Sequence, residues 1–258
     1  KLRFGPKAWY GEWLDAFVRI PEMKKGKNGT VTMTDTPSFI ERIDVTSAGT
    51  DMAVDAAKLL ARMVAQKTNS SNGFAAGDIV MDRAYSLGYE RFLEPARAFG
   101  FLPHFAMRAD QLGVHGDVRG MLIVDGQPFS PRMPAALRNI TPPKVPGSPK
   151  ADIDAWQAEV AKRAPYAIKL RGSTTSGVFD LSCPAARDFG AMRCGNKPES
   201  LLLPATIPLA PPRNVGKPLP DICAKQRIRV NAEDLPLWQP HLHGSSQWWA
   251  SMGRRSRV

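Results

Sequence analysis

The first hundred residues alternate between two hydrophobic periods, which predict strands and helices in turn. Residues 8–20 (AWYGEWLDAFVRI) and 39–46 (FIERIDVT) alternate apolar and polar positions, a pattern typical of strands. Residues 24–36 between them are rich in Gly, Lys and Thr and predict a loop. Residues 47–67 change to helical spacing, with Asp51 placed as the N-cap. The apolar face of this helix is expected to contain Val54, Ala57, Leu60, Ala61 and Val64.

The same alternation continues as far as residue 107. Residues 78–81 are a short, mostly apolar run that predicts a buried strand. Residues 89–99 predict a second helix, because the apolar residues share one face and Gly100 follows directly as a C-cap. Residues 101–107 predict the next strand. Strands that are joined by helices pair in parallel through right-handed crossovers, so we expect an α/β fold.

The pattern changes after Arg108, where proline becomes frequent. Seven prolines lie between residues 128 and 149, and seven lie between residues 198 and 220. Proline fixes φ and removes a backbone donor, so regular structure should be sparse there. We expect residues 108–232 to be an insertion packed on an α/β core of residues 1–107. The short elements expected within it are a hairpin strand at 120–124, a helix at 153–164 and strands at 166–170 and 177–181.

The last segment predicts one more helix. We expect residues 233–258 to contain the C-terminal helix of the core, truncated at Val258. Ser245 stands where a capping serine would begin it. Its buried side is expected to carry Trp248, Trp249 and Met252.

The composition of the chain indicates which class of partner it binds. The chain has 258 residues, of which 43% are hydrophobic, and a net charge of +11, which favours a nucleic-acid partner. No apolar run approaches the roughly 20 residues of a membrane span and no signal peptide opens the chain. We therefore expect a soluble, cytoplasmic protein with no membrane partner. The basic clusters expected to contact DNA are Lys24, Lys25 and Lys27, and Arg254, Arg255 and Arg257, although each would also fit a solvated loop or tail.

Three cysteines leave two interpretations open. An odd number of cysteines without a secretory signal argues against a disulfide framework and for a reducing cytosol. Three thiolates and an imidazole would form a tetrahedral zinc set, for which the candidates are Cys183, Cys194, Cys223 and either His241 or His243. The spacing contains no C-x-x-C pair, so buried free thiols are the alternative.

The segment DIVMDRAYS, residues 78–86, carries the strongest candidate chemistry. Asp82 follows the apolar run directly, and a carboxylate at the end of a buried strand can serve as a metal ligand or catalytic acid. The alternative is that Asp82 only caps the helical turn that follows. Arg83 matches the geometry of a phosphate, or it pairs with Asp78 or Glu90.

The order of several motifs resembles the DDE-type transposases of insertion sequences in high-GC Gram-positive bacteria. The resemblance covers nearly the whole chain, and the D-R-A-Y-S segment at 82–86 with the R-x-R-V ending at 255–258 is its most specific part. The other matching segments are GPKAWYG at 5–11, GMLIVDG at 120–126, PRMP at 131–134, CPA at 183–185, IC at 222–223 and QPHLHGS at 239–245.

This resemblance implies an RNase H-like mixed sheet with helices on both faces and a large Pro-rich insertion before the final helix. It implies DNA strand cleavage and transfer at two divalent ions, Mg²⁺ or Mn²⁺, held by three carboxylates. Asp82 would be the second carboxylate, while the first is expected upstream of Lys1 and the third after Val258, in missing segments of the same gene. Other acids are not expected to complete the triad, namely Asp15, Asp44, Asp110 and Asp125. Asp110 and Asp125 stand near turn residues, and Asp125-Gly126 predicts a hairpin turn.

We therefore expect a transposase-like catalytic-core fragment that is inactive as this chain, is associated with the bacterial nucleoid and is compatible with a homodimer. Two alternatives belong to other classes of protein. One is a basic, non-catalytic nucleic-acid-binding protein that keeps an RNase H-like core. The other is a structural or assembly protein whose basic charge serves a different polyanion or a partner surface.

Overall fold

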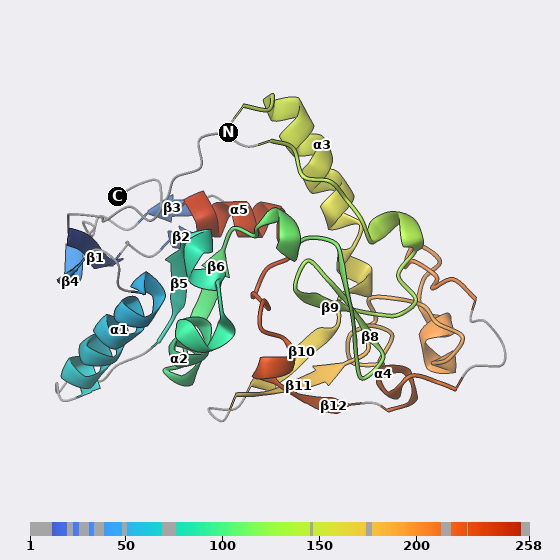
Figure 1. The fold of residues 1–258 in the computed structure, drawn as a ribbon. Coiled ribbons are helices and arrows are strands. Elements are labelled where there is room, and N and C mark those ends of the chain that lie inside the picture. The colour runs from blue at the N-terminus through green and yellow to red at the C-terminus, as the bar shows by residue number, and fades with distance from the viewer. Residues whose placement is uncertain are drawn as a thin grey trace.

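A computed structural model of the chain shows a mixed α/β protein, as the hydrophobic periods predict (Figure 1). It describes residues 12–19, 23–25, 31–33, 39–47, 51–68, 76–144, 147–173, 177–212, 218–225 and 227–253. The described strands form five small sheets, so the single mixed sheet expected from the resemblance is not continuous within these ranges.

The N-terminal strands pair as a long antiparallel hairpin. The strands β1 (Glu12–Arg19) and β4 (Phe39–Ser47) are close to the predicted strands. The predicted loop at 24–36 is wrong in part, because β2 (Met23–Lys25) and β3 (Val31–Met33) pair with each other. The Gly- and Lys-rich composition of this segment obscured β-branched Val and Thr residues, which favour extended backbone.

The first helix, α1 (Met52–Thr68), is capped as predicted, since Asp51 Oδ1 accepts a hydrogen bond of 3.1 Å from the amide of Ala53. Its predicted apolar face is displaced by about one residue. Only Leu60 of the predicted face is fully buried, because the longer side chains of Leu59 and Met63 fill the core in place of Ala61 and Val64. The buried residues are Ala53, Ala56, Leu59, Leu60 and Met63.

A parallel strand pair follows. The strands β5 (Asp78–Met81) and β6 (Leu102–Phe105) run in the same direction, as predicted, and end opposite each other at Met81 and Phe105. The second predicted helix is shorter than 89–99, since α2 (Leu93–Ala98) is preceded by two 3₁₀ turns, η1 (Arg83–Ser86) and η2 (Tyr89–Arg91). Pro95 explains this late start, because proline is tolerated only in the first turn of a helix.

The next strands form a meander with two tight turns. These strands are β7 (Val114–Val118), β8 (Met121–Val124) and β9 (Gln127–Phe129). Both residues of each connecting turn have positive φ, 50° and 78° at Arg119–Gly120 and 47° and 68° at Asp125–Gly126. Positive φ at both positions defines the two-residue turn that matches strand twist, so the Asp-Gly turn prediction is confirmed.

The remaining elements complete the second half of the chain. A three-stranded antiparallel sheet contains β10 (Lys169–Ser173), β11 (Val178–Ser182) and β12 (Ile228–Asn231). The helices are α3 (Lys150–Ala161), α4 (Asp221–Ala224) and α5 (Ser246–Gly253). The 3₁₀ turns are η3 (Ala109–Gln111), η4 (Ala135–Leu137), η5 (Ala164–Tyr166), η6 (Pro198–Leu202) and η7 (Ala232–Asp234). Ser245 caps α5 as predicted, with Trp248 and Met252 buried and Trp249 half-buried.

Buried apolar side chains of the described residues form two hydrophobic clusters. The elements that build the two clusters lie side by side in Figure 1. One is built by α1, β5, α2 and β6, and the other by the strands and loops from β8 to Trp238. Arg97 joins them, because its guanidinium donates to the backbone carbonyls of Leu235, Pro236 and Trp238. The interpretation of 108–232 as an insertion remains a prediction. In the described part of the chain no helix is both long and apolar enough to cross a membrane.

Candidate functional site

Asp82 lies where the sequence places it, directly after β5 at the carboxyl end of the parallel pair. Its side chain is exposed, and Oδ1 accepts a hydrogen bond of 3.4 Å from the amide of Ala84. This contact is long for a hydrogen bond, so the cap is weak. The strand-end position and the capping role are therefore both present.

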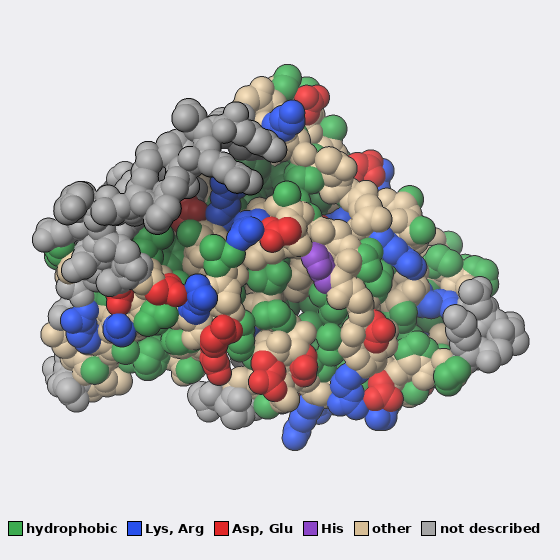
Figure 2. All heavy atoms as spheres, in the orientation of Figure 1, with side chains coloured by type: hydrophobic (Ala, Val, Ile, Leu, Met, Phe, Trp, Pro, Cys, Tyr) green, Lys and Arg blue, Asp and Glu red, His purple; other side chains and the backbone are tan. Residues whose placement is uncertain are grey.

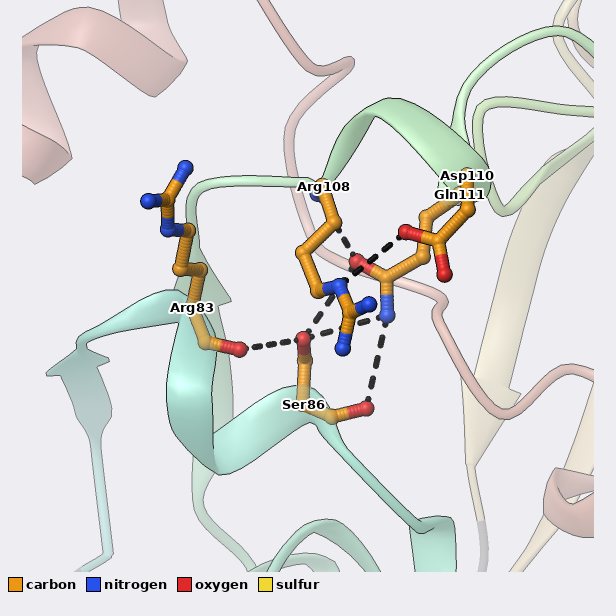
Figure 3. A network of polar contacts seen from close by, with 5 residues as sticks. All are labelled: Arg83, Ser86, Arg108, Asp110 and Gln111. Carbon is orange, nitrogen blue, oxygen red and sulfur yellow. Dashed lines mark hydrogen bonds and ion pairs between the residues drawn. The ribbon is translucent and has the colours of Figure 1, made fainter. Parts of the chain in front are cut away.

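Arg83 projects from the same edge. Its side chain is exposed and points away from the neighbouring polar network (Figure 3). The ion pair that the sequence allowed with Asp78 or Glu90 is not formed among the described residues. Asp78 lies instead at the other end of β5, with Oδ1 3.2 Å from Nε2 of the buried His104. A phosphate-binding role for Arg83 stays a prediction.

A polar network joins the ends of β5 and β6 (Figure 3). Ser86, the last residue of η1, is buried, and its hydroxyl lies 2.7 Å from the carbonyl oxygen of Arg83. Gln111, on η3, contacts Ser86 through its amide nitrogen, at 3.2 Å from Oγ. Its amide oxygen accepts a hydrogen bond of 3.0 Å from the backbone amide of Arg108. The network therefore links the turn after β5 to the turn after β6.

A second carboxylate lies beyond the same end of the β5–β6 pair. Asp110 is exposed on η3, and its Oδ1 is 3.0 Å from Nε of Arg108. The sequence interpretation placed Asp110 near a turn, without a ligand role. Asp110 therefore takes part in an exposed ion pair at this end of the sheet.

The C-terminal segment reaches the same end of the sheet. The indole nitrogen of Trp248, on α5, donates to the carbonyl oxygen of Phe105 at 3.2 Å, and Gln239 Oε1 accepts from the amide of Phe105 at 3.0 Å. Phe105 is the last residue of β6 and pairs with Met81, the residue before Asp82. Helix α5 therefore packs beside the edge that carries Asp82 (Figure 1).

A buried histidine near this region was missed by the sequence interpretation. His104 lies in the apolar strand β6 with no exposed surface, and the centres of its ring and the His241 ring are 5.3 Å apart. The available signal was a histidine within an otherwise apolar strand. Asp125 was also incompletely interpreted, because besides its turn role it forms a buried ion pair with Arg163 and accepts from the amide of Gly113.

The candidate zinc set is not brought together. The three cysteines are buried in one hydrophobic cluster, where burial raises the pKa of the Cys183 thiol and raises that of Cys223 to about 11. Among the residues that the structure describes, no group of three or more His, Cys, Asp and Glu could hold a metal ion.

His243 lies apart, against tryptophan rings rather than thiols. The centre of its ring is 4.6 Å from that of Trp248 and 5.8 Å from that of Trp156. Burial lowers the pKa of His243 to about 4, which keeps the imidazole neutral near pH 7.

Most residues of the two predicted DNA-contacting clusters lie outside the described part of the chain. Lys24 and Lys25 lie on β2, where only the backbone is described, and Lys27, Arg254, Arg255 and Arg257 lie outside the described residues. On the face in Figure 2, Lys and Arg side chains are interspersed with Asp and Glu. Several described arginines are internally paired, including Arg119 with Asp221 and Arg227 with Asp180.

No known protein family, curated protein sequence or solved structure matches this chain. The evidence on its function comes from the sequence motifs and from the residues at the carboxyl ends of β5 and β6.

Proposed function

We propose that this chain is a catalytic-core segment of a DDE-type transposase and that Asp82 is one of the carboxylates that hold its divalent metal ions. The observation that carries the proposal is the position of Asp82 at the end of β5, in parallel with β6 and beside α5. By resemblance, α5 is the helix that precedes the third acid. Helix α5 packs on Phe105, the last residue of β6, through the indole of Trp248.

The order of elements also supports an RNase H-like core. The antiparallel pair β1–β4 is followed by α1, by the strand that delivers the acid, and by a helical crossover to the parallel strand β6. The Pro-rich residues 108–232 then separate β6 from α5, as an insertion before the final helix would. We propose that β1, β4, β5 and β6 belong to one such core.

Asp82 fits one ligand position for Mg²⁺ or Mn²⁺. It is an exposed carboxylate directly after β5, and both ions prefer oxygen ligands. When bound, a pair of such ions would stabilise the attacking and leaving oxygens of a phosphate undergoing in-line displacement. Asp82 would hold one ion in place, and Arg83 would bind a neighbouring DNA phosphate with its guanidinium.

The test is a DNA cleavage and strand-transfer assay with the full-length gene product, Asp82→Asn and Asp110→Asn. Asp82→Asn should reduce Mg²⁺-dependent cleavage by at least about 100-fold while DNA binding persists, because the amide keeps the shape but loses the charge. Asp110→Asn is the matched control and should retain most activity, since Asp110 is already paired with Arg108.

The alternatives give different results in the same assay. Salt-sensitive DNA binding without cleavage by the wild-type protein would favour the non-catalytic nucleic-acid-binding protein. Absence of both binding and cleavage would favour the structural or assembly protein. Equal activity of wild type and Asp82→Asn would show that Asp82 takes no part in the cleavage reaction.

A further inference from the structure

The parallel sheet stops one residue before Asp82. The last paired residues are Met81 and Phe105, so the backbone ladder between β5 and β6 does not extend to the turns that carry Asp82 and Arg108. A metal ligand must be held within about 0.5 Å of its productive position. Another contact therefore has to fix these two turns relative to each other.

Gln111 makes that contact. Its side chain spans from the amide of Arg108, at 3.0 Å, to the hydroxyl of Ser86, at 3.2 Å, across 25 residues of sequence. Ser86 is 4% exposed and closes η1 by its contact with the carbonyl oxygen of Arg83. The turn that Asp82 caps is thus tied to η3 through two side chains (Figure 3).

The direction of these hydrogen bonds follows from the number of protons. A serine hydroxyl has one proton to donate. If Ser86 donates it to the carbonyl oxygen of Arg83, at 2.7 Å, its oxygen must accept from Gln111 Nε2. Gln111 Oε1 then accepts from the amide of Arg108, although it also lies 3.3 Å from Ser86 Oγ, and Nε2 lies 3.5 Å from the carbonyl oxygen of Ser86. The amide at position 111 supplies both the donor to Ser86 and the acceptor for Arg108.

We infer that Gln111, acting through Ser86, is a positioning residue for the Asp82 site, fixing the turn that carries the acid relative to the end of β6. This inference rests on the proposed function. Residues that orient a metal ligand typically change metal affinity or activity by about 10- to 100-fold when they are replaced. The expected signature is a higher metal requirement rather than weaker DNA binding.

The test uses Gln111→Glu, which keeps the shape of the side chain and removes the donor to Ser86. In the full-length gene product, the Mg²⁺ concentration for half-maximal cleavage should rise by about 10-fold or more. Its affinity for DNA should remain that of wild type. Gln157→Glu is the matched control, because Gln157 lies half-exposed on α3 and its metal requirement should not change. Ser86→Ala removes the hydroxyl partner of Gln111 and leaves Nε2 only its 3.5 Å contact with the carbonyl oxygen of residue 86, so it should shift the metal requirement in the same direction.

The outcomes separate this inference from the proposed function. If wild type cleaves DNA and Asp82→Asn does not, an unchanged metal requirement in both Gln111→Glu and Ser86→Ala would overturn the positioning role alone. A fall in thermal stability without a shift in metal requirement would have the same meaning, because the contact would then be only structural. If wild type shows neither cleavage nor Mn²⁺ binding that depends on Asp82, both the proposed function and this inference fail.

Discussion

At the scale of single residues, burial determines the chemistry of the side chains in the C-terminal segment. His243 is 7% exposed and packs against two tryptophans, and its pKa is lowered to about 4 mainly by desolvation. The negative charge of Asp125 raises this pKa and the positive charge of Arg163 lowers it, so their effects oppose each other. The histidine is therefore a neutral imidazole in the core near pH 7.

This burial predicts a pH dependence of stability. The unfolded chain takes up a proton on His243 near pH 6.5, whereas the folded chain does so only near pH 4. Stability should thus fall as pH decreases from about 6.5 to about 4, by on the order of 3 kcal/mol from this residue. Urea unfolding across this range should show a weaker pH dependence in His243→Phe than in wild type. His115→Gln, at an exposed position, should keep the wild-type dependence, and equal slopes in all three proteins would contradict the assignment.

At the scale of elements, the turn between β8 and β9 is fixed by close packing. Gly126 has a φ of 68°, and a Cβ there would lie 2.6 Å from Leu237 Cβ and 2.7 Å from the Leu237 carbonyl oxygen. Gly116 also has positive φ, 97°, but nothing lies within 4 Å of its Cβ position. Alanine substitutions at these two glycines therefore separate the cost of backbone strain from the cost of steric conflict.

Gly126→Ala should lower the free energy of unfolding by about 2–5 kcal/mol, since strain of about 1–2 kcal/mol adds to overpacking of about 1–3 kcal/mol. Gly116→Ala should cost only about 1–2 kcal/mol. Urea titration measures both, with an unchanged slope indicating an unchanged unfolded state. Equal losses in the two variants would show that the contact with Leu237 does not constrain the turn.

The elements also show what the sequence could predict. The strand before Asp82, the cap at Asp51 and the Asp-Gly turn depend on neighbouring residues, and local patterns predicted them. The link between Ser86 and Gln111 depends on two turns meeting across 25 residues, which no local pattern specifies. The buried face of α1 was displaced because Leu59 and Met63 are buried in place of Ala61 and Val64, and this choice depends on the elements packed against the helix.

At the scale of the whole molecule, the net charge of +11 should produce weak DNA binding with little sequence preference. Phosphate neutralisation gives an affinity that falls steeply between about 50 and 200 mM salt. Joint neutralisation of Lys24, Lys25 and Lys27 with Arg254, Arg255 and Arg257 should weaken binding by similar factors on unrelated duplexes. Filter binding or fluorescence anisotropy at several salt concentrations measures this.

The matched control neutralises arginines that are already paired. Arg119 and Arg227 form ion pairs with Asp221 and Asp180, so removing both guanidinium charges should change DNA affinity less than removing the two basic clusters. Binding that does not respond to salt, or that is lost only in the paired-arginine variant, would contradict a DNA-binding role for the clusters.

The most direct measurement of the central claim is a crystal structure of the full-length gene product grown with Mn²⁺, with the metal located by anomalous scattering. We predict a peak about 2.1–2.2 Å from a carboxylate oxygen of Asp82, at the carboxyl ends of β5 and β6, which is absent in Asp82→Asn. A fully occupied metal site elsewhere with none at Asp82, or no site at millimolar Mn²⁺, would contradict the assignment of Asp82 as a metal ligand.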